Sequence, residues 1–163
     1  MTISDEAPLI DACSTMRGII LVIFLFGALS AGVELLLLGH TESPWQWVPL
    51  ALIVVSLVAL LFHAIVRRAM SVRIFQVIML LFIISSFVGI WQHYQAKVEF
   101  KLETNPALSG MELFWEAVTG ATVPPVLAPG MMIQLGLLGL AYTYRHPALI
   151  SSAKRNEPST TGE

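Results

Sequence analysis

The stretch GIILVIFLFGALSAGVELLLL, residues 18–38, decides the fold class of this chain. It is uncharged apart from Glu34. A helix of this length would be about 31 Å long at 1.5 Å per residue, which matches the hydrocarbon core of a bilayer. The stretch therefore predicts a membrane-spanning helix.

A cleaved signal peptide is the competing interpretation of this stretch. Arg17 precedes it, and Ala28-Leu29-Ser30 resembles a small-residue cleavage site. However, the apolar run continues to Leu38, and the leader before it, residues 1–16, is long and acidic. Both features favour an anchor that stays in the membrane.

Three further apolar runs follow, and composition agrees with them. The chain of 163 residues is 56% hydrophobic and 12% charged, with a mean hydropathy of +0.76. Soluble domains carry about 25% charged residues, so the surplus apolar surface must face lipid. We predict an all-α integral membrane four-helix bundle, residues 17–146, between the leader 1–16 and a disordered tail 147–163. Its spans are residues 18–38, 45–66, 74–94 and 126–145.

The longest connection, residues 95–125, carries most of the remaining charge. Within it, Ser109 and Glu112 have the spacing of a helix capping box. This spacing predicts a short amphipathic helix that ends at Gly120 and lies at the membrane interface. Residues 98–103 alternate apolar and charged side chains, which is the period of a strand, although no partner strand is evident.

Charge asymmetry predicts the orientation. In the four-span arrangement seven of the nine basic residues fall on one side, and only Lys97 and Lys101 fall on the other. Because cytoplasmic loops are enriched in Lys and Arg, both termini are predicted to be cytoplasmic. The seven are Arg17, Arg67, Arg68, Arg73, Arg145, Lys154 and Arg155.

Small residues at helical spacing predict where the helices approach one another closely. Gly27 and Ala31 form one such pair, and Gly136 and Gly139 form another. Gln76 and Gln134, polar residues inside spans, could each hydrogen-bond a neighbouring helix.

Glu34, His40 and His93 form the candidate polar cluster. An ionisable side chain inside a span costs several kcal/mol unless it is paired or hydrated. His40 and His93 are expected at the same outer level as Glu34, where the three could handle a proton or a metal ion. Alternatively, Glu34 lies about one turn from the boundary and reaches water.

The histidines suggest two more specific hypotheses, a di-haem site and a divalent metal site, which we keep as alternatives to our prediction. His40 and His93 fall at one end of the helices and His63 and His146 at the other, as a di-haem protein would require. A divalent metal site could form on the outer face, from His40, Glu42, His93, Glu99, Glu112 and Glu116. We predict no catalytic residue and no cofactor, with haem or a divalent metal as alternatives.

These features are typical of a small bacterial multi-pass protein of the inner (plasma) membrane. We expect a non-enzymatic accessory protein or subunit of a membrane complex, which contacts lipid and either other membrane proteins or copies of itself. The alternatives are an ion-, metal- or haem-handling protein that uses Glu34, His40 and His93, and a small oligomeric transporter. With a net charge of −2, no nucleic-acid partner is expected.

Overall fold

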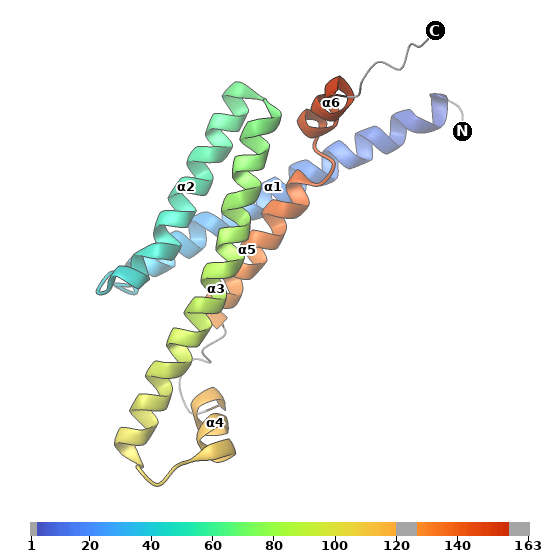
Figure 1. Cartoon of the computed structure of the whole chain (residues 1–163). Coiled ribbons are helices and arrows are strands. Elements are labelled where there is room, and N and C mark those ends of the chain that lie inside the picture. The colour runs from blue at the N-terminus through green and yellow to red at the C-terminus, as the bar shows by residue number, and fades with distance from the viewer. Residues whose placement is uncertain (1–2, 120–126, 157–163) are drawn as a thin grey trace.

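The protein is described by a computed structural model that covers residues 3–119 and 127–156, and within these ranges it contains helices and no strand (Figure 1). The sequence-based expectation of an all-helical chain is confirmed for this part. The helices are α1 (Ile3–Leu37), α2 (Pro44–Val66), α3 (Ala69–Thr104), α4 (Gly110–Thr119), α5 (Leu127–Thr143) and α6 (Pro147–Asn156).

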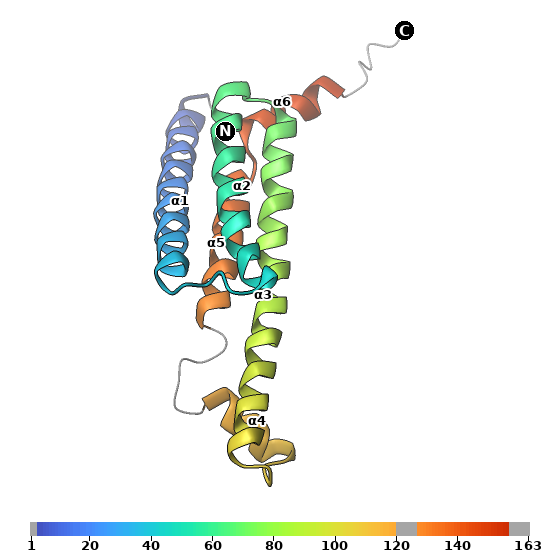
Figure 2. The same ribbon diagram turned by 90° about the vertical axis from the view of Figure 1, so that its left-hand side faces the viewer.

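Helices α1, α2, α3 and α5 pack side by side (Figure 2). Helix α5 contacts α1 and α3, and α2 also contacts both of them. We call the end of these helices that carries Arg67, Arg68 and Arg73 the arginine end. The opposite end, which carries Trp45 and Trp47, is called the tryptophan end.

Three helices in the described ranges are long and apolar enough to cross a membrane. Helix α5 is described over 17 residues, from Leu127; Val126, where we expected the fourth span to begin, lies outside the described residues. The three spans are Asp11–Leu37, Pro44–Val66 and Ala69–Thr104.

Helical structure extends beyond the predicted boundaries in three places. Helix α3 continues to Thr104, so residues 95–104 are helical where we expected a loop, and the strand-like alternation of 98–103 was misleading. An isolated strand would leave its backbone groups unpaired, whereas prolonging an existing helix satisfies them. Residues 3–16 of the leader belong to α1.

The third difference concerns the tail. Residues 147–156 form helix α6 where we expected disorder, whereas residues 157–163 lie outside the described ranges. Pro147 stands at the first position of this helix, where its missing N–H costs nothing. Helix α6 also contacts α3, so tertiary packing supports it.

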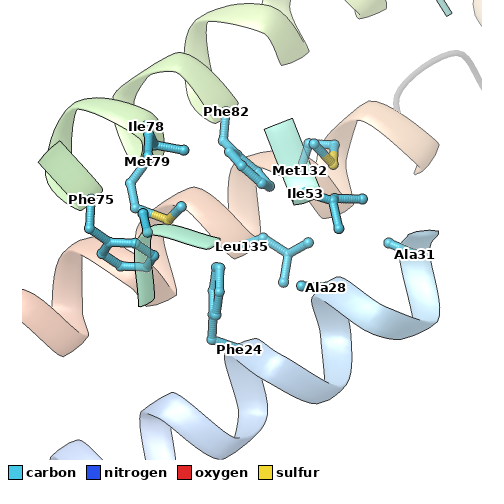
Figure 3. Close-up of a cluster of buried hydrophobic side chains, with 11 residues drawn as sticks. Phe24, Ala28, Ala31, Ile53, Phe75, Ile78, Met79, Phe82, Met132 and Leu135 are labelled. Atoms are coloured by element: carbon cyan, nitrogen blue, oxygen red, sulfur yellow. The ribbon is translucent and has the colours of Figure 1, made fainter. Parts of the chain in front are cut away.

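The interior of the four packed helices is filled by apolar side chains (Figure 3). Phe24 and Phe75 meet edge to face with ring centroids 5.6 Å apart. Phe82 and Met79 are fully buried beside them. By contrast, the outward faces of α1, α2 and α3 expose large apolar side chains such as Phe26, which is the pattern expected where helices face lipid.

Glycines permit the closest helix contacts, as the small-residue pattern predicted. A Cβ atom on Gly136 would lie 2.7 Å from Ile83 Cγ1 and 2.9 Å from the backbone oxygen of Met79. One on Gly27 would lie 2.9 Å from Leu135 Cδ2. Gly136 is therefore required by the approach of α3, because a backbone oxygen cannot move aside, whereas Gly27 faces the movable end of the Leu135 side chain.

A hydrogen bond links α3 and α5 as well. Gln76 Nε2 donates to Thr143 Oγ1 over 3.1 Å, and the Thr143 hydroxyl donates in turn to the Leu140 carbonyl. The expectation of a hydrogen bond to a neighbouring helix is confirmed for Gln76. Gln134 is instead exposed on α5, and its side chain makes no hydrogen bond within the described residues.

Candidate functional site

His40 is positioned by the way α1 ends. Gly39 takes the left-handed conformation, at a φ of 63°. The His40 N–H then bonds the Leu35 carbonyl over 2.9 Å, and the Gly39 N–H bonds the Leu36 carbonyl over 3.1 Å. This is the Schellman pattern of helix ends. It holds His40 at the tryptophan end of the packed helices.

The connection from α1 to α2 is fixed by two side chains of α2. Gln46 Oε1 accepts the backbone N–H groups of Glu42 and Ser43, and Trp47 Nε1 donates to the Thr41 carbonyl over 3.1 Å. The loop that carries His40 is therefore held by hydrogen bonds to the end of α1 and to the first turn of α2.

His40 and His93 come together, as the sequence suggested. Their rings are stacked with centroids 6.2 Å apart and planes inclined by 26°. His93 lies on the part of α3 that leaves the packed helices and is exposed, whereas His40 is half-buried. The two imidazoles come from different elements and meet at the tryptophan end.

Glu34 does not join this pair. Its side chain lies on the exposed surface of α1 and makes no hydrogen bond or ion pair within the described residues. In the same ranges, no group of three or more His, Cys, Asp and Glu side chains has a metal-binding arrangement.

The other two histidines meet at the arginine end. The rings of His63 and His146 are 4.9 Å apart and nearly perpendicular. His63 closes α2 and is only 8% exposed, whereas His146 follows α5. All four histidines are thus paired, one pair at each end of the packed helices.

Hydrogen bonds define the His63 tautomer. The Ser71 hydroxyl donates to the Arg68 carbonyl over 2.7 Å, and its oxygen lies 2.8 Å from His63 Nδ1. When the Ser71 hydroxyl donates its only proton to the Arg68 carbonyl, His63 Nδ1 is the donor to Ser71. The lone pair of neutral His63 is therefore on Nε2, which has no partner among the described residues.

His146 has the complementary arrangement. Its Nδ1 accepts the Ala148 N–H over 3.3 Å, so neutral His146 carries its proton on Nε2. Burial, the neighbouring His63 and the charge of Arg17 together lower the pKa of His146 to about 4. His146 is consequently neutral at pH 7.

A hollow of about 510 Å³ opens beside this second pair. It lies between the end of α2, the end of α5 and the start of α6. Its polar lining residues are His63, Arg67, Tyr142, His146 and Ser151.

The chain matches no protein-family model, and no curated protein or solved structure is significantly similar to it.

The sequence predicted that His63 and His146 lie at the same end of the helices, but it did not predict the contact of His146 with Tyr142 or the hydrogen bond of His63 with Ser71. Tyr142 and His146 are four residues apart, a spacing that brings side chains together on helices, so this contact could have been anticipated. The bond from His63 to Ser71 depends on the turn between α2 and α3. That turn requires Arg67 in the left-handed conformation, and residue spacing does not reveal it.

A second candidate surface lies beyond the tryptophan end. Here the last turns of α3 and the short α4 form what we call the α3–α4 hairpin, residues 91–119 (Figure 2). Tyr94 contacts Phe114 with ring centroids 6.0 Å apart. Lys101 Nζ lies 2.7 Å from Glu116 Oε2. Helix α4 thus packs along α3, and we had not predicted this contact.

The α3–α4 hairpin exposes large apolar side chains. Phe100 is 64% exposed, Met111 69% and Trp115 55%. Its sequence carries four Glu and two Lys, a net charge of −2. The surface is therefore apolar and acidic at once.

Proposed function

We propose that the chain is a four-span protein of the plasma membrane, with α5 as the fourth span and both termini cytoplasmic. Three apolar helices and the close packing of α5 against α1 and α3 support the four-span arrangement. The arginine end would then face the cytoplasm, because cytoplasmic loops are enriched in Lys and Arg. The α3–α4 hairpin would lie on the opposite side.

Within the membrane this protein acts as a non-enzymatic accessory subunit that binds another membrane protein through the α3–α4 hairpin. The length of α3 is the observation that carries this proposal. Of its 36 residues, the ten from 95 to 104 follow the predicted span 74–94 and extend the helix by about 15 Å beyond it. That extension, braced by α4, presents Phe100, Met111 and Trp115.

The charge of the hairpin indicates what kind of partner it would bind. A surface that combines exposed aromatic side chains with a net charge of −2 suits a partner with a basic rim around an apolar patch. Aromatic residues contribute much of the binding energy at protein interfaces. The partner should therefore contact Phe100 and Trp115 directly.

Site-specific photo-cross-linking tests this function. A photoreactive side chain at Phe100 should give a discrete adduct with one membrane protein, and Trp115→Ser should remove that adduct without lowering the melting temperature. The same photoreactive side chain at Val58, on the exposed face of α2, should label lipid only. Identical products from Phe100 and Val58 would contradict the proposal.

A small oligomeric transporter is less well supported than the accessory subunit. A path through the middle of one chain would have to pass Phe24, Phe75 and Phe82, which are fully buried in an apolar core. Transport would therefore require a pathway between copies.

The stacked rings of His40 and His93 favour a second candidate function, the handling of a proton, a metal ion or haem near the outer face. Glu34 could join them only if its side chain turned from the exposed face of α1. Elemental analysis and the visible absorption spectrum of purified protein test this candidate. Stoichiometric metal, or a haem band that is lost in His93→Ala, would support it; wild-type protein with neither would contradict it.

A further inference from the structure

One arginine lines the hollow at the arginine end, and the charge of a second acts on two of its lining residues, Tyr142 and His146. Arg67 lines it, and its Nε donates to the Ala64 carbonyl over 3.3 Å, which holds the guanidinium over the end of α2. Arg17 approaches from α1 and donates Nη2 to the Arg145 carbonyl over 3.2 Å. Neither Arg67 nor Arg17 forms an ion pair within the described residues. Both can therefore still bind an anion, and Arg is well suited to phosphate.

Two histidines add one hydrogen-bond acceptor and one donor to the hollow. His63 is more than nine-tenths buried, lines the hollow and has an unpartnered Nε2 that accepts a hydrogen bond. His146 offers an Nε2–H donor, because its Nδ1 is occupied by the Ala148 N–H. A ligand that fits both must carry an acceptor, such as a phosphate oxygen, and a donor, such as a hydroxyl.

The position of the hollow favours a lipid as the source of that phosphate. The hollow lies at the arginine end of α2, a helix that is long and apolar enough to cross a membrane. If α2 spans the bilayer, this end lies at the level of the lipid headgroups. Basic pockets at the cytoplasmic ends of membrane helices are suited to anionic headgroups.

We propose that this hollow binds the headgroup of an anionic phospholipid with a free hydroxyl, such as phosphatidylglycerol. Arg67 and Arg17 contact the phosphate, the His146 Nε2–H donates to a phosphate oxygen, and His63 Nε2 accepts from the headgroup hydroxyl. The site would tie together α1, α2 and the start of α6. This inference concerns the end of the protein opposite to the α3–α4 hairpin and does not depend on the hairpin's partner.

Melting temperatures of delipidated protein in detergent test the proposal. Phosphatidylglycerol should raise the melting temperature by several degrees, whereas phosphatidylcholine and inorganic phosphate at the same concentrations should not. An equal shift with phosphatidylcholine would overturn the anion site. An equal shift with inorganic phosphate would overturn the lipid as the ligand.

Neighbouring arginines provide a matched pair of variants. Arg67→Asn removes the charge that lines the hollow, and asparagine tolerates the left-handed conformation at this position. Arg68→Asn removes the same charge one residue away, outside the lining. We expect Arg67→Asn to lose at least two thirds of the phosphatidylglycerol shift, and Arg68→Asn and Arg67→Lys to keep most of it. Equal losses in Arg67→Asn and Arg68→Asn would overturn the assignment.

Discussion

Replacing Gly136 by alanine should weaken the contact between α3 and α5. The added Cβ would lie 2.7 Å from Ile83 Cγ1 and 2.9 Å from the Met79 backbone oxygen, and ordinary contacts begin near 3.4 Å. A backbone oxygen cannot rotate away as the end of a side chain can, so the two helices must separate by about half an ångström. Overpacking of this kind costs about 1–3 kcal/mol.

The same helix offers the control for Gly136→Ala. A Cβ on Gly130 would meet no heavy atom within 4 Å. Gly130→Ala should therefore be neutral or stabilising, because alanine favours helix by up to about 1 kcal/mol over glycine. Thermal unfolding in mild detergent should show Gly136→Ala melting roughly 2–12 °C below wild type. If Gly136→Ala melts at or above wild type, the close approach of α3 and α5 is wrong.

Three further predictions concern contacts outside that interface. The pKa of His146, about 4, lies below the 6.5 of an unfolded histidine, so the unfolded chain takes up this proton first and stability should fall as pH drops from 7 to 4. His146→Asn should flatten this pH dependence of the melting temperature; an unchanged slope would contradict the assignment. Gln76→Leu and Thr143→Val should each destabilise, and a double-mutant cycle should give a coupling of about 0.6 kcal/mol, whereas zero coupling would remove the hydrogen bond. Lys101→Met should cost at most about 1 kcal/mol, because the ion pair with Glu116 is partly exposed, yet speed hydrogen exchange in α4. Unaltered exchange there would show that the pair does not hold α4 on α3.

Hydropathy and spacing were sufficient to predict the apolar helices and several of their contacts, but not the helical segments 3–16, 95–104 and 147–156. Long apolar runs leave few structural choices, because backbone groups in lipid must be bonded within a helix. Gly136 and Gly27 were recognised as contact residues because only small side chains permit close approach. The common level of His40 and His93 was expected from their places at the ends of the apolar runs, whereas the stacking of their rings was not.

The direction of Glu34 could have been predicted from its place on the helix. At about 100° per residue, it lies roughly 90° around α1 from the middle of the small-residue seam formed by Gly27, Ala28, Ala31 and Gly32. We grouped Glu34 with His40 and His93 because they were expected at the same level, yet a common level does not place side chains on facing sides of their helices. The exposed side chain is consistent with that angle.

Other features could not be predicted because they depend on tertiary contacts. Helix α3 beyond Tyr94 carries alternating charges, and its contact with α4 is not visible in either segment alone. The hollow at the arginine end requires α2, α5 and α6 to converge, with Arg67 in a left-handed turn. Local sequence patterns carry no information on such convergence.

The central claim is a four-span protein with its ends on one side of the membrane and the α3–α4 hairpin on the other, and cysteine labelling tests it most directly. Cys13, the single cysteine of the chain, is exposed on α1. In spheroplasts treated with a membrane-impermeant maleimide, Cys13 should react only after the membrane is opened. With Cys13 replaced by serine, Glu103→Cys in the hairpin should react in intact spheroplasts. Labelling of both positions from the same side would contradict the account.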